Sequence, residues 1–95
     1  MTVNGGNNQD APAGTPLLQA LTVLVTDQYG NPVSGASVTF DDGSAGGTFG
    51  PNPATTGSNG IATQTYTLPP AAGTVTITAM VAGVSNPAVF TETAD

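Results

Sequence analysis

The sequence contains no lysine, arginine or histidine, and the lack of side-chain cations excludes several classes of function. Proteins that bind nucleic acid regardless of sequence obtain their affinity from cationic side chains placed on phosphates, and this chain has none. Attraction to anionic lipid headgroups depends on the same residue types. We therefore expect neither nucleic acid nor a membrane surface among the partners of this chain.

The missing residue types also remove most catalytic chemistry. Without histidine, cysteine or lysine, the chain cannot form a triad based on His or Cys, or a Schiff-base lysine. The absence of cysteine excludes disulfides and thiolate metal sites, and the absence of lysine excludes Lys–Asn isopeptide cross-links. Tryptophan is missing as well, so the core must be built from Val, Leu, Ile, Phe and Tyr.

Acidic side chains give the chain a net charge of −6. They are Asp10, Asp27, Asp41, Asp42, Glu92 and Asp95. We interpret them as solvated charges that keep the protein soluble through mutual repulsion. No stretch approaches the ~20 apolar residues of a membrane helix, so we expect no direct membrane insertion. The chain also shows no signal-peptide pattern. Its 95 residues suit one domain, so we expect a single domain, residues 1–95, cut from a longer exported protein.

Residues 21–40 organise the chain, with the sequence LTVLVTDQYGNPVSGASVTF. Apolar and polar residues alternate over residues 21–26 and again over 36–40, a pattern typical of strands. Asp27 suits the first position of a turn because its carboxylate can accept a local N–H, and Gly30 can adopt a positive φ. We expect this turn to set the register between the two flanking strands.

Short alternating segments continue on both sides of this region. Strands are expected at residues 2–4, 54–56, 61–68, 74–81 and 88–93, with an edge piece at 15–19, loops at 5–14 and 41–54, and a turn at 83–87. We place Tyr66 and Leu68 inward, with Gln64 on the same face near a rim that water reaches. Phe90 is also expected inward, and Phe49 is expected to plug one end of the core. Seven to eight short strands without a helical period indicate an all-β sandwich.

Several motifs occur in a fixed order along nearly the whole chain. They are NGGNNQ at 4–9, GTPL at 14–17, DQYGNPV with GASVTF within 27–40, TGSNGIA at 56–62, and the stretch from GTV at 73–75 to AG at 82–83. Together they resemble the bacterial immunoglobulin-like domains of group 1, the invasin/intimin type. The resemblance implies an Ig-like sandwich of mostly antiparallel strands with Greek-key connections and an extracellular or bacterial cell-surface location. It also implies neighbouring Ig-like domains of the same polypeptide as partners.

Candidate sites for chemistry are few. Two carboxylates could hydrolyse a glycosidic bond, but Asp41 and Asp42 are adjacent and would point to opposite faces of a strand. A pairing of Asp27 with either of them has no supporting motif. We therefore predict no enzyme, no catalytic residue and no cofactor. Asp41 and Asp42, with the carbonyls of residues 43–47, are weak Ca²⁺ candidates, whereas a solvated loop is the simpler interpretation. Tyr29 at the turn tip is a possible contact for a ligand or a neighbouring domain.

The other residues of interest have structural roles in turns. They are Asp27, Gly30, Asn31, Pro32, Gly35, Asn59 and Gly60. We expect a structural spacer in a bacterial cell-surface or secreted adhesin-like protein. One alternative is a module that binds a host or cell-surface protein, or a glycan, through the loops near Tyr29 and residues 41–50. Another is an accessory domain of an extracellular hydrolase. The segment DQYGNPVSGASV also resembles carboxypeptidase-regulatory-like and pilin-type repeat domains, which share such turns.

Overall fold

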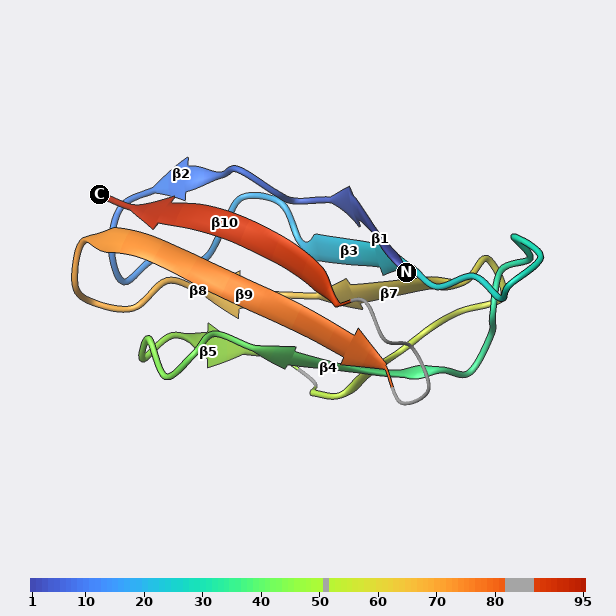
Figure 1. Ribbon diagram of the computed structural model, residues 1–95. Coiled ribbons are helices and arrows are strands. Elements are labelled where there is room, and N and C mark those ends of the chain that lie inside the picture. Colours follow the sequence, from blue (N-terminus) through green and yellow to red (C-terminus); the bar gives the residue numbers. More distant parts are fainter. Residues whose placement is uncertain (51, 82–86) are drawn as a thin grey trace.

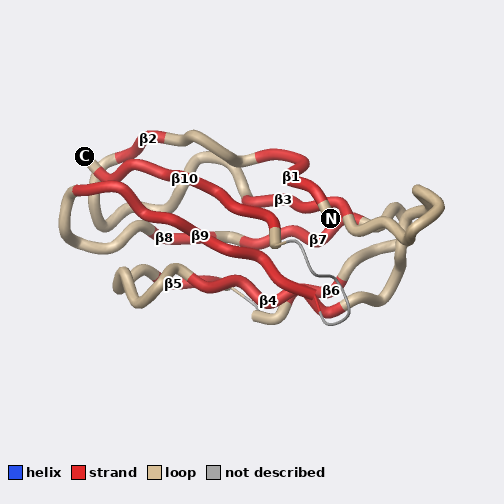
Figure 2. Tube along the Cα trace, in the orientation of Figure 1, coloured by secondary structure: helices blue, strands red, loops and turns tan. Residues whose placement is uncertain are grey.

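The computed structural model describes residues 1–50, 52–81 and 87–95, and every regular element among them is a β-strand (Figures 1 and 2). The strands are β1 (Thr2–Gly5), β2 (Asp10–Ala11), β3 (Leu21–Leu24), β4 (Ser37–Asp41), β5 (Thr48–Phe49), β6 (Ala54–Thr55), β7 (Ile61–Gln64), β8 (Tyr66–Thr67), β9 (Gly73–Val81) and β10 (Ala88–Ala94). No helix that is long and apolar enough to cross a membrane occurs in these residues.

The strands form two main sheets that pack as the layers of a sandwich (Figure 1). One sheet has the order β2-β10-β9-β4-β6, the other has the order β1-β3-β7, and β5 pairs with β8. The named strands pair antiparallel except β2 and β10, which are parallel. The predicted all-β, immunoglobulin-like sandwich of mostly antiparallel strands is confirmed.

The core lies between the sheets and takes alternate residues from each strand. In β9, Val75, Ile77 and Ala79 are buried, while the side chains between them face outward or are only partly covered. The ring of Phe49 lies 6.2 Å from that of Phe40 and 4.7 Å from that of Tyr66, between ring centroids. Phe49 therefore packs against the core as predicted.

The predicted strand at residues 61–68 is instead two strands in different sheets. β7 pairs with β3 and ends at Gln64, whereas β8 begins at Tyr66 and pairs with β5. The inward face continues across the break, because Gln64, Tyr66 and Leu68 are all buried. Gln64 is fully buried, so its predicted position at a wet rim is wrong. The alternation of apolar and polar residues indicates which face of a strand is buried, but it does not indicate which other strand pairs with it.

The flanking strands of the organising segment, β3 and β4, also belong to different sheets. The prediction that the turn at residue 27 sets their mutual register is therefore wrong. The connection between them crosses from one layer to the other and is held by Thr56. Its hydroxyl donates to the Val33 carbonyl (2.7 Å) and accepts from the Ala36 N–H (2.8 Å). Val33 N–H donates to the Val25 carbonyl (2.9 Å), which closes the turn locally.

The N-terminal residues join both sheets. β1 pairs with β3 in the smaller main sheet, and β2 pairs with β10 in the larger one. The predicted loop at residues 5–14 therefore contains a short edge strand, which two paired residues are too few to reveal by alternation. Of the predicted turn at residues 83–87, only Pro87 lies within the described residues.

A second turn packs beneath the first at one end of the molecule. The Val25 N–H donates to the Gly60 carbonyl (2.8 Å). Gly60 has a φ of 77°, and a Cβ there would lie 2.7 Å from Pro32 Cβ and 2.8 Å from the Val25 carbonyl oxygen. Gly30 also has a positive φ, 84°, but a Cβ there would meet nothing within 4 Å. Substitution of Gly30 therefore tests backbone strain alone, whereas substitution of Gly60 tests backbone strain and steric crowding together.

We expect Gly60→Ala to destabilise the protein more than Gly30→Ala. A positive φ disfavours any Cβ by about 1–2 kcal/mol, and this penalty applies to both variants. The crowded site adds an overpacking term, so Gly60→Ala should lower the free energy of unfolding by about 2–4 kcal/mol in total. Urea unfolding of both variants measures the difference. Equal losses would show that the two turns do not pack as described.

Candidate functional site

Asp27 closes the turn at one end of the molecule through hydrogen bonds to its carboxylate. Its Oδ1 accepts from the backbone N–H groups of Tyr29 (2.8 Å) and Asn31 (2.9 Å), and its Oδ2 accepts from Asn31 Nδ2 (3.3 Å). The Gly30 N–H donates to the Asp27 carbonyl (3.1 Å). The amides of Asn31 and Tyr29 hold the pKa of Asp27 below its usual value. The turn is thus fixed by an ionised carboxylate at neutral pH.

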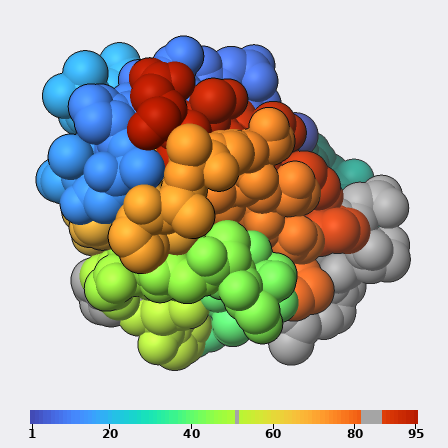
Figure 3. Space-filling model, turned by 90° about the vertical axis from the view of Figure 1, so that its left-hand side faces the viewer, coloured from blue at the N-terminus to red at the C-terminus, as the bar shows by residue number. Residues whose placement is uncertain are grey.

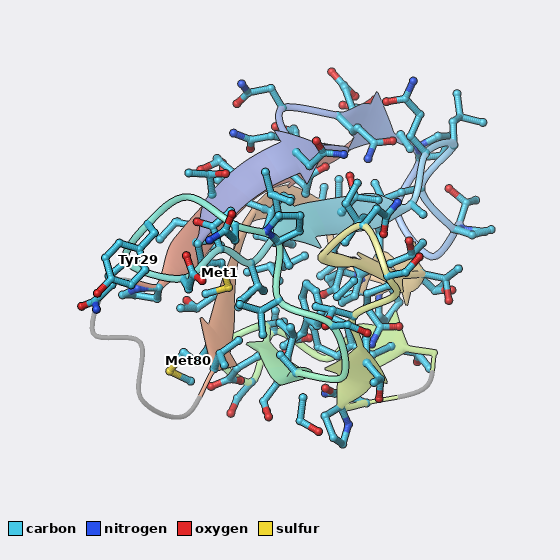
Figure 4. The ribbon with its side chains drawn as sticks, turned by 90° about the vertical axis from the view of Figure 1, so that its right-hand side faces the viewer. Met1, Tyr29 and Met80 are labelled. Atoms are coloured by element: carbon cyan, nitrogen blue, oxygen red, sulfur yellow. The ribbon has the colours of Figure 1, made fainter. Side chains whose placement is uncertain are left out.

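Tyr29 projects from this turn and is 79% exposed. Figure 4 shows it at the outer margin of the end that also carries Met1 and Met80. The protruding turn in Figure 1 lies beyond the N-terminus on the same side of the molecule. Tyr29 is thus an aromatic side chain held on a braced turn at the N-terminal end, and it is available for contact with another molecule or a neighbouring domain.

Asp41 and Asp42 lie at the opposite end, where their carboxylates bind the local backbone. Asp41 Oδ1 accepts from the Gly43 N–H (3.0 Å), and Asp42 Oδ1 accepts from the Ser44 N–H (3.1 Å). Asp42 Oδ2 accepts from the Gly47 N–H (3.1 Å) and from the Tyr66 hydroxyl (2.9 Å). Burial and the neighbouring Asp42 raise the pKa of Tyr66. Asp42 therefore anchors its loop to the buried Tyr66 side chain.

This arrangement offers little room for the Ca²⁺ site that the sequence suggested. Both Asp42 oxygens already accept hydrogen bonds, and Asp41 Oδ1 accepts from the Gly43 N–H. The described residues contain no group of three or more acidic, histidine or cysteine side chains that could hold a metal ion. Figure 3 shows this end of the molecule, where loop residues near 45 lie beside residues near 70.

The structure does not bring the sequence-derived candidates together. The molecule measures 40 × 21 × 20 Å, and the turn of Tyr29 and the loop of Asp42 lie at opposite ends of its long axis (Figure 1). Asp27 therefore lies at the opposite end of the molecule from Asp41 and Asp42 and forms no carboxylate pair with either of them. The two loops therefore do not form one contact surface, and the turn of Tyr29 and the loop at residues 41–50 stay separate candidate contacts.

Asn52 has a structural role that sequence reasoning missed. Its Oδ1 accepts from the Phe40 N–H (3.0 Å), and its Nδ2 donates to the Phe40 carbonyl (2.8 Å). One amide side chain thus makes the two hydrogen bonds that a neighbouring strand would make, and it continues the edge of β4 beyond β6. The sequence holds no signal for this, because Asn in a Pro-rich loop suits a turn equally well.

Glu92 is the acidic residue that differs most from its expected state. It is 0% exposed and points between the sheets from β10. Its Oε2 accepts from the Gln9 N–H (3.2 Å), and Oε1 has no hydrogen-bond partner among the described residues. Burial raises the pKa of Glu92 to about 7, although the amides of Gln9 and Asn8 act in the opposite direction. The interpretation of Glu92 as a solvated charge is therefore wrong.

The position of Glu92 could have been found from its strand. Phe90 was predicted to face inward, and residues two apart on a strand share a face, so Glu92 had to face inward too. The neighbouring Gln9 is itself fixed by its side chain. Its Nε2 donates to the carbonyls of Gly6 (2.6 Å) and Gln19 (2.9 Å), and its Oε1 accepts from the Gln19 N–H (2.9 Å).

Comparison with known proteins places this fold in a family. Residues 5–93 match the family model described as bacterial Ig-like domain (group 1). Among solved structures, the D0-D1 domain of intimin has a TM-score of 0.73 at 21% identity, covering 98% of this chain and 47% of that one. A second similar structure is the C-terminal 282-residue fragment of intimin, solved with the intimin-binding domain of the translocated intimin receptor. Its TM-score is 0.73 at 18% sequence identity, and the match covers 98% of this chain and 33% of that one.

A structure from outside the intimins is also similar. Domains 4 and 5 of the S-layer protein SbsC give a TM-score of 0.70 at 19% identity, covering 99% of this chain and 51% of that one. This chain spans less than half the length of the two intimin structures. No curated protein matches the chain.

The buried carboxyl predicts an unusual dependence of stability on pH. Because the pKa of Glu92 rises from 4.5 to about 7 on folding, the folded state binds more protons than the unfolded state between these values. The contribution of Glu92 to the free energy of unfolding is therefore highest below about pH 4.5 and falls as pH rises to about pH 7. Glu92→Gln removes the effect and should raise the free energy of unfolding by roughly 1–3 kcal/mol at about pH 8.

Urea unfolding over this pH range measures the effect. The matched control is Asp41→Asn, which removes one charge from an exposed position and keeps an oxygen for the Gly43 N–H. The gain from Glu92→Gln should grow with pH, while the effect of Asp41→Asn should not follow the same curve. A gain that stays constant across the range would contradict a buried carboxyl at residue 92.

Proposed function

The chain belongs to the bacterial Ig-like domain family (group 1), and we propose that it is a non-catalytic spacer in a bacterial cell-surface or secreted adhesin-like protein. Its task would be mechanical: to hold a binding module at a distance from the cell while tension acts along the chain. The extracellular location follows from the same proposal. The partners would be neighbouring Ig-like domains of the same polypeptide, each adding up to about 40 Å of length.

The observation that carries this proposal is the pairing of β2 with β10. These strands lie side by side and run parallel, and each is the segment nearest to one terminus on that sheet (Figure 1). Tension applied through the termini pulls β2 and β10 in opposite directions along their length. The hydrogen bonds between them are then loaded together in shear rather than opened one at a time. A parallel pair at the termini is therefore suited to carry load.

Several backbone hydrogen bonds reinforce this contact. They run from the N–H of Asn8 to Thr91 O (3.0 Å), Thr93 to Gln9 O (2.9 Å), Asp95 to Ala11 O (2.9 Å) and Ala13 to Asp95 O (3.1 Å). The Thr91 N–H also donates to the side chain of Asn7 (2.8 Å). β10 in turn pairs with β9 over its full length, from Ala88 opposite Ala79 to Ala94 opposite Gly73. Load on β10 thus passes into the centre of the larger sheet.

The state of the acidic residues supports the absence of catalysis. Asp27 and Asp42 hold turns through their carboxylates, and Glu92 is enclosed between the sheets. General acid–base chemistry needs a titratable group that can reach a substrate. Glu92, whose pKa is raised to about 7, is enclosed between the sheets and cannot reach a substrate.

A second candidate function is direct binding through Tyr29. Its side chain is 79% exposed, and its turn is braced by Asp27, so an anchor residue would be presented at low entropic cost. The intimin fragment was solved with the intimin-binding domain of the translocated intimin receptor, which gives the precedent of a receptor protein as the partner of a similar structure. On this alternative the partner is a host or cell-surface protein, or a glycan, that contacts the turn.

Substitution of Tyr29 in the full-length parent protein separates the two functions. As a spacer, the domain should tolerate Tyr29→Ala with unchanged folding and unchanged adhesion. The matched control is Leu18→Ala, because Leu18 is 93% exposed and lies outside this turn. Replacing the whole domain by an unrelated sandwich of similar length should preserve adhesion, whereas deleting it should weaken adhesion.

The opposite outcome would identify a contact site. A buried aromatic anchor can contribute ~2 kcal/mol or more to binding, so its loss would weaken adhesion about tenfold or more. If Tyr29→Ala did this while the domain stayed folded and Leu18→Ala had no effect, the spacer proposal would be wrong.

A further inference from the structure

We propose that Glu92 is a pH-sensitive latch for the edge segment, residues 7–11: the protonated carboxyl keeps this segment on β10, and ionisation releases it. The proposal concerns a local opening and not the unfolding of the domain. It does not rest on the spacer function, because it follows from the surroundings of one side chain.

The first observation is the enclosure of the carboxyl under the edge segment. Glu92 is 0% exposed, and its Oε2 accepts from the Gln9 N–H (3.2 Å), which belongs to the edge segment. Its Oε1 has no hydrogen-bond partner among the described residues. An ionised carboxylate with one oxygen unpaired in the interior is strongly disfavoured, whereas the neutral acid is tolerated. Moving the edge segment aside would admit water to the carboxyl.

The second observation is that, in the part of the chain that the structure describes, no charged group faces Glu92 to compensate for its ionisation. On β9 it lies opposite Val75, and no residue of β9, β1 or β3 is titratable. The nearest acids in sequence and pairing are Asp10, opposite Thr93, and Asp95; both are exposed on the other face of the sheet. The remaining titratable group of the interior is Tyr66, whose hydroxyl donates to Asp42. Relief can therefore come only from hydration.

The third observation is that, of the elements that surround Glu92, the edge segment requires the least free energy to displace. Ala11 is its one residue in the buried core. By contrast, β9 contributes Val75, Ile77 and Ala79. Release of the edge segment exposes little apolar surface. It breaks the backbone hydrogen bonds to β10 and the hydrogen bonds of the Gln9 side chain to Gly6 and Gln19, all of which water can replace. Such segments open at much lower free energy than the whole domain.

Release would have a structural consequence at the edge of the larger sheet. The backbone N–H groups of Thr91, Thr93 and Asp95 would lose their partners in the edge segment. β10 would then be an open edge strand, which is a surface that accepts an added strand from another chain. A rise in pH would therefore expose the backbone hydrogen-bonding groups of β10.

Thiol labelling tests the local opening directly. The chain has no cysteine, so Ala11→Cys introduces a single thiol in the edge segment. Ala79→Cys is the matched control, because residue 79 is buried on the central strand β9 and reports global unfolding. Each labelling rate is divided by that of the same thiol in urea at the same pH. From about pH 5.5 to about pH 8.5 the corrected rate at residue 11 should rise tenfold or more and exceed that at residue 79.

The Glu92→Gln background decides whether Glu92 causes this rise. In the double variant with Ala11→Cys, the corrected rate should stay flat with pH. A rise that persists without the carboxyl, or equal corrected rates at residues 11 and 79 at every pH, would overturn the latch. If Ala11→Cys does not fold, hydrogen exchange of the Thr93 and Asp95 amides, which donate to Gln9 and Ala11, gives the same readout in the unaltered chain.

A spectroscopic measurement tests the state of the carboxyl independently. Glu92 is the chain's one glutamate, so ¹³C-labelled glutamate gives a single side-chain carboxyl signal. Its midpoint in the folded protein should lie near pH 7, and the amide signals of residues 8 and 91 should shift with the same midpoint. A midpoint near 4.5, the ordinary value for glutamate, would also overturn the proposal.

Discussion

The lack of side-chain cations is the constraint on which the rest of this structure depends. A carboxylate in most proteins can pair with lysine or arginine, but here it can only be solvated, accept hydrogen bonds from neutral donors, or keep its proton. All three solutions occur. Asp10 and Asp95 are exposed to solvent, Asp27 and Asp42 accept from backbone N–H groups, and Glu92 lies enclosed with a raised pKa.

The positions of these acidic side chains also determine which segments of the molecule are held in place by hydrogen bonds. At the N-terminal end, the carboxylate of Asp27 braces the turn that presents Tyr29. At the other end, Asp42 joins its loop to the hydroxyl of the buried Tyr66. Between them, the edge segment lies over Glu92 and connects β2 to β10. The contact that would bear tension thus covers Glu92, whose pKa is raised to about 7 by burial.

Sequence reasoning reached the fold but not the partners of each strand. Alternation assigned the inward faces of Tyr66, Leu68 and Phe90 correctly, because burial of one face is a local property. It did not reveal that the chain changes sheets at Thr65, that β3 and β4 lie in different layers, or that two residues form β2. These depend on contacts between residues far apart in sequence. Glu92 was missed for another reason: its charge was taken as a sign of exposure, although its strand position indicated the interior.

Mechanical pulling tests most directly whether this domain is built to carry tension along its long axis. The same protein is pulled through its two termini, which shears β2 against β10, or between a cysteine replacing the exposed Pro12 and the C-terminus, which peels the pair apart from one end. We expect a higher unfolding force for the first geometry, because its hydrogen bonds are loaded together. An equal or lower force through the termini would contradict it.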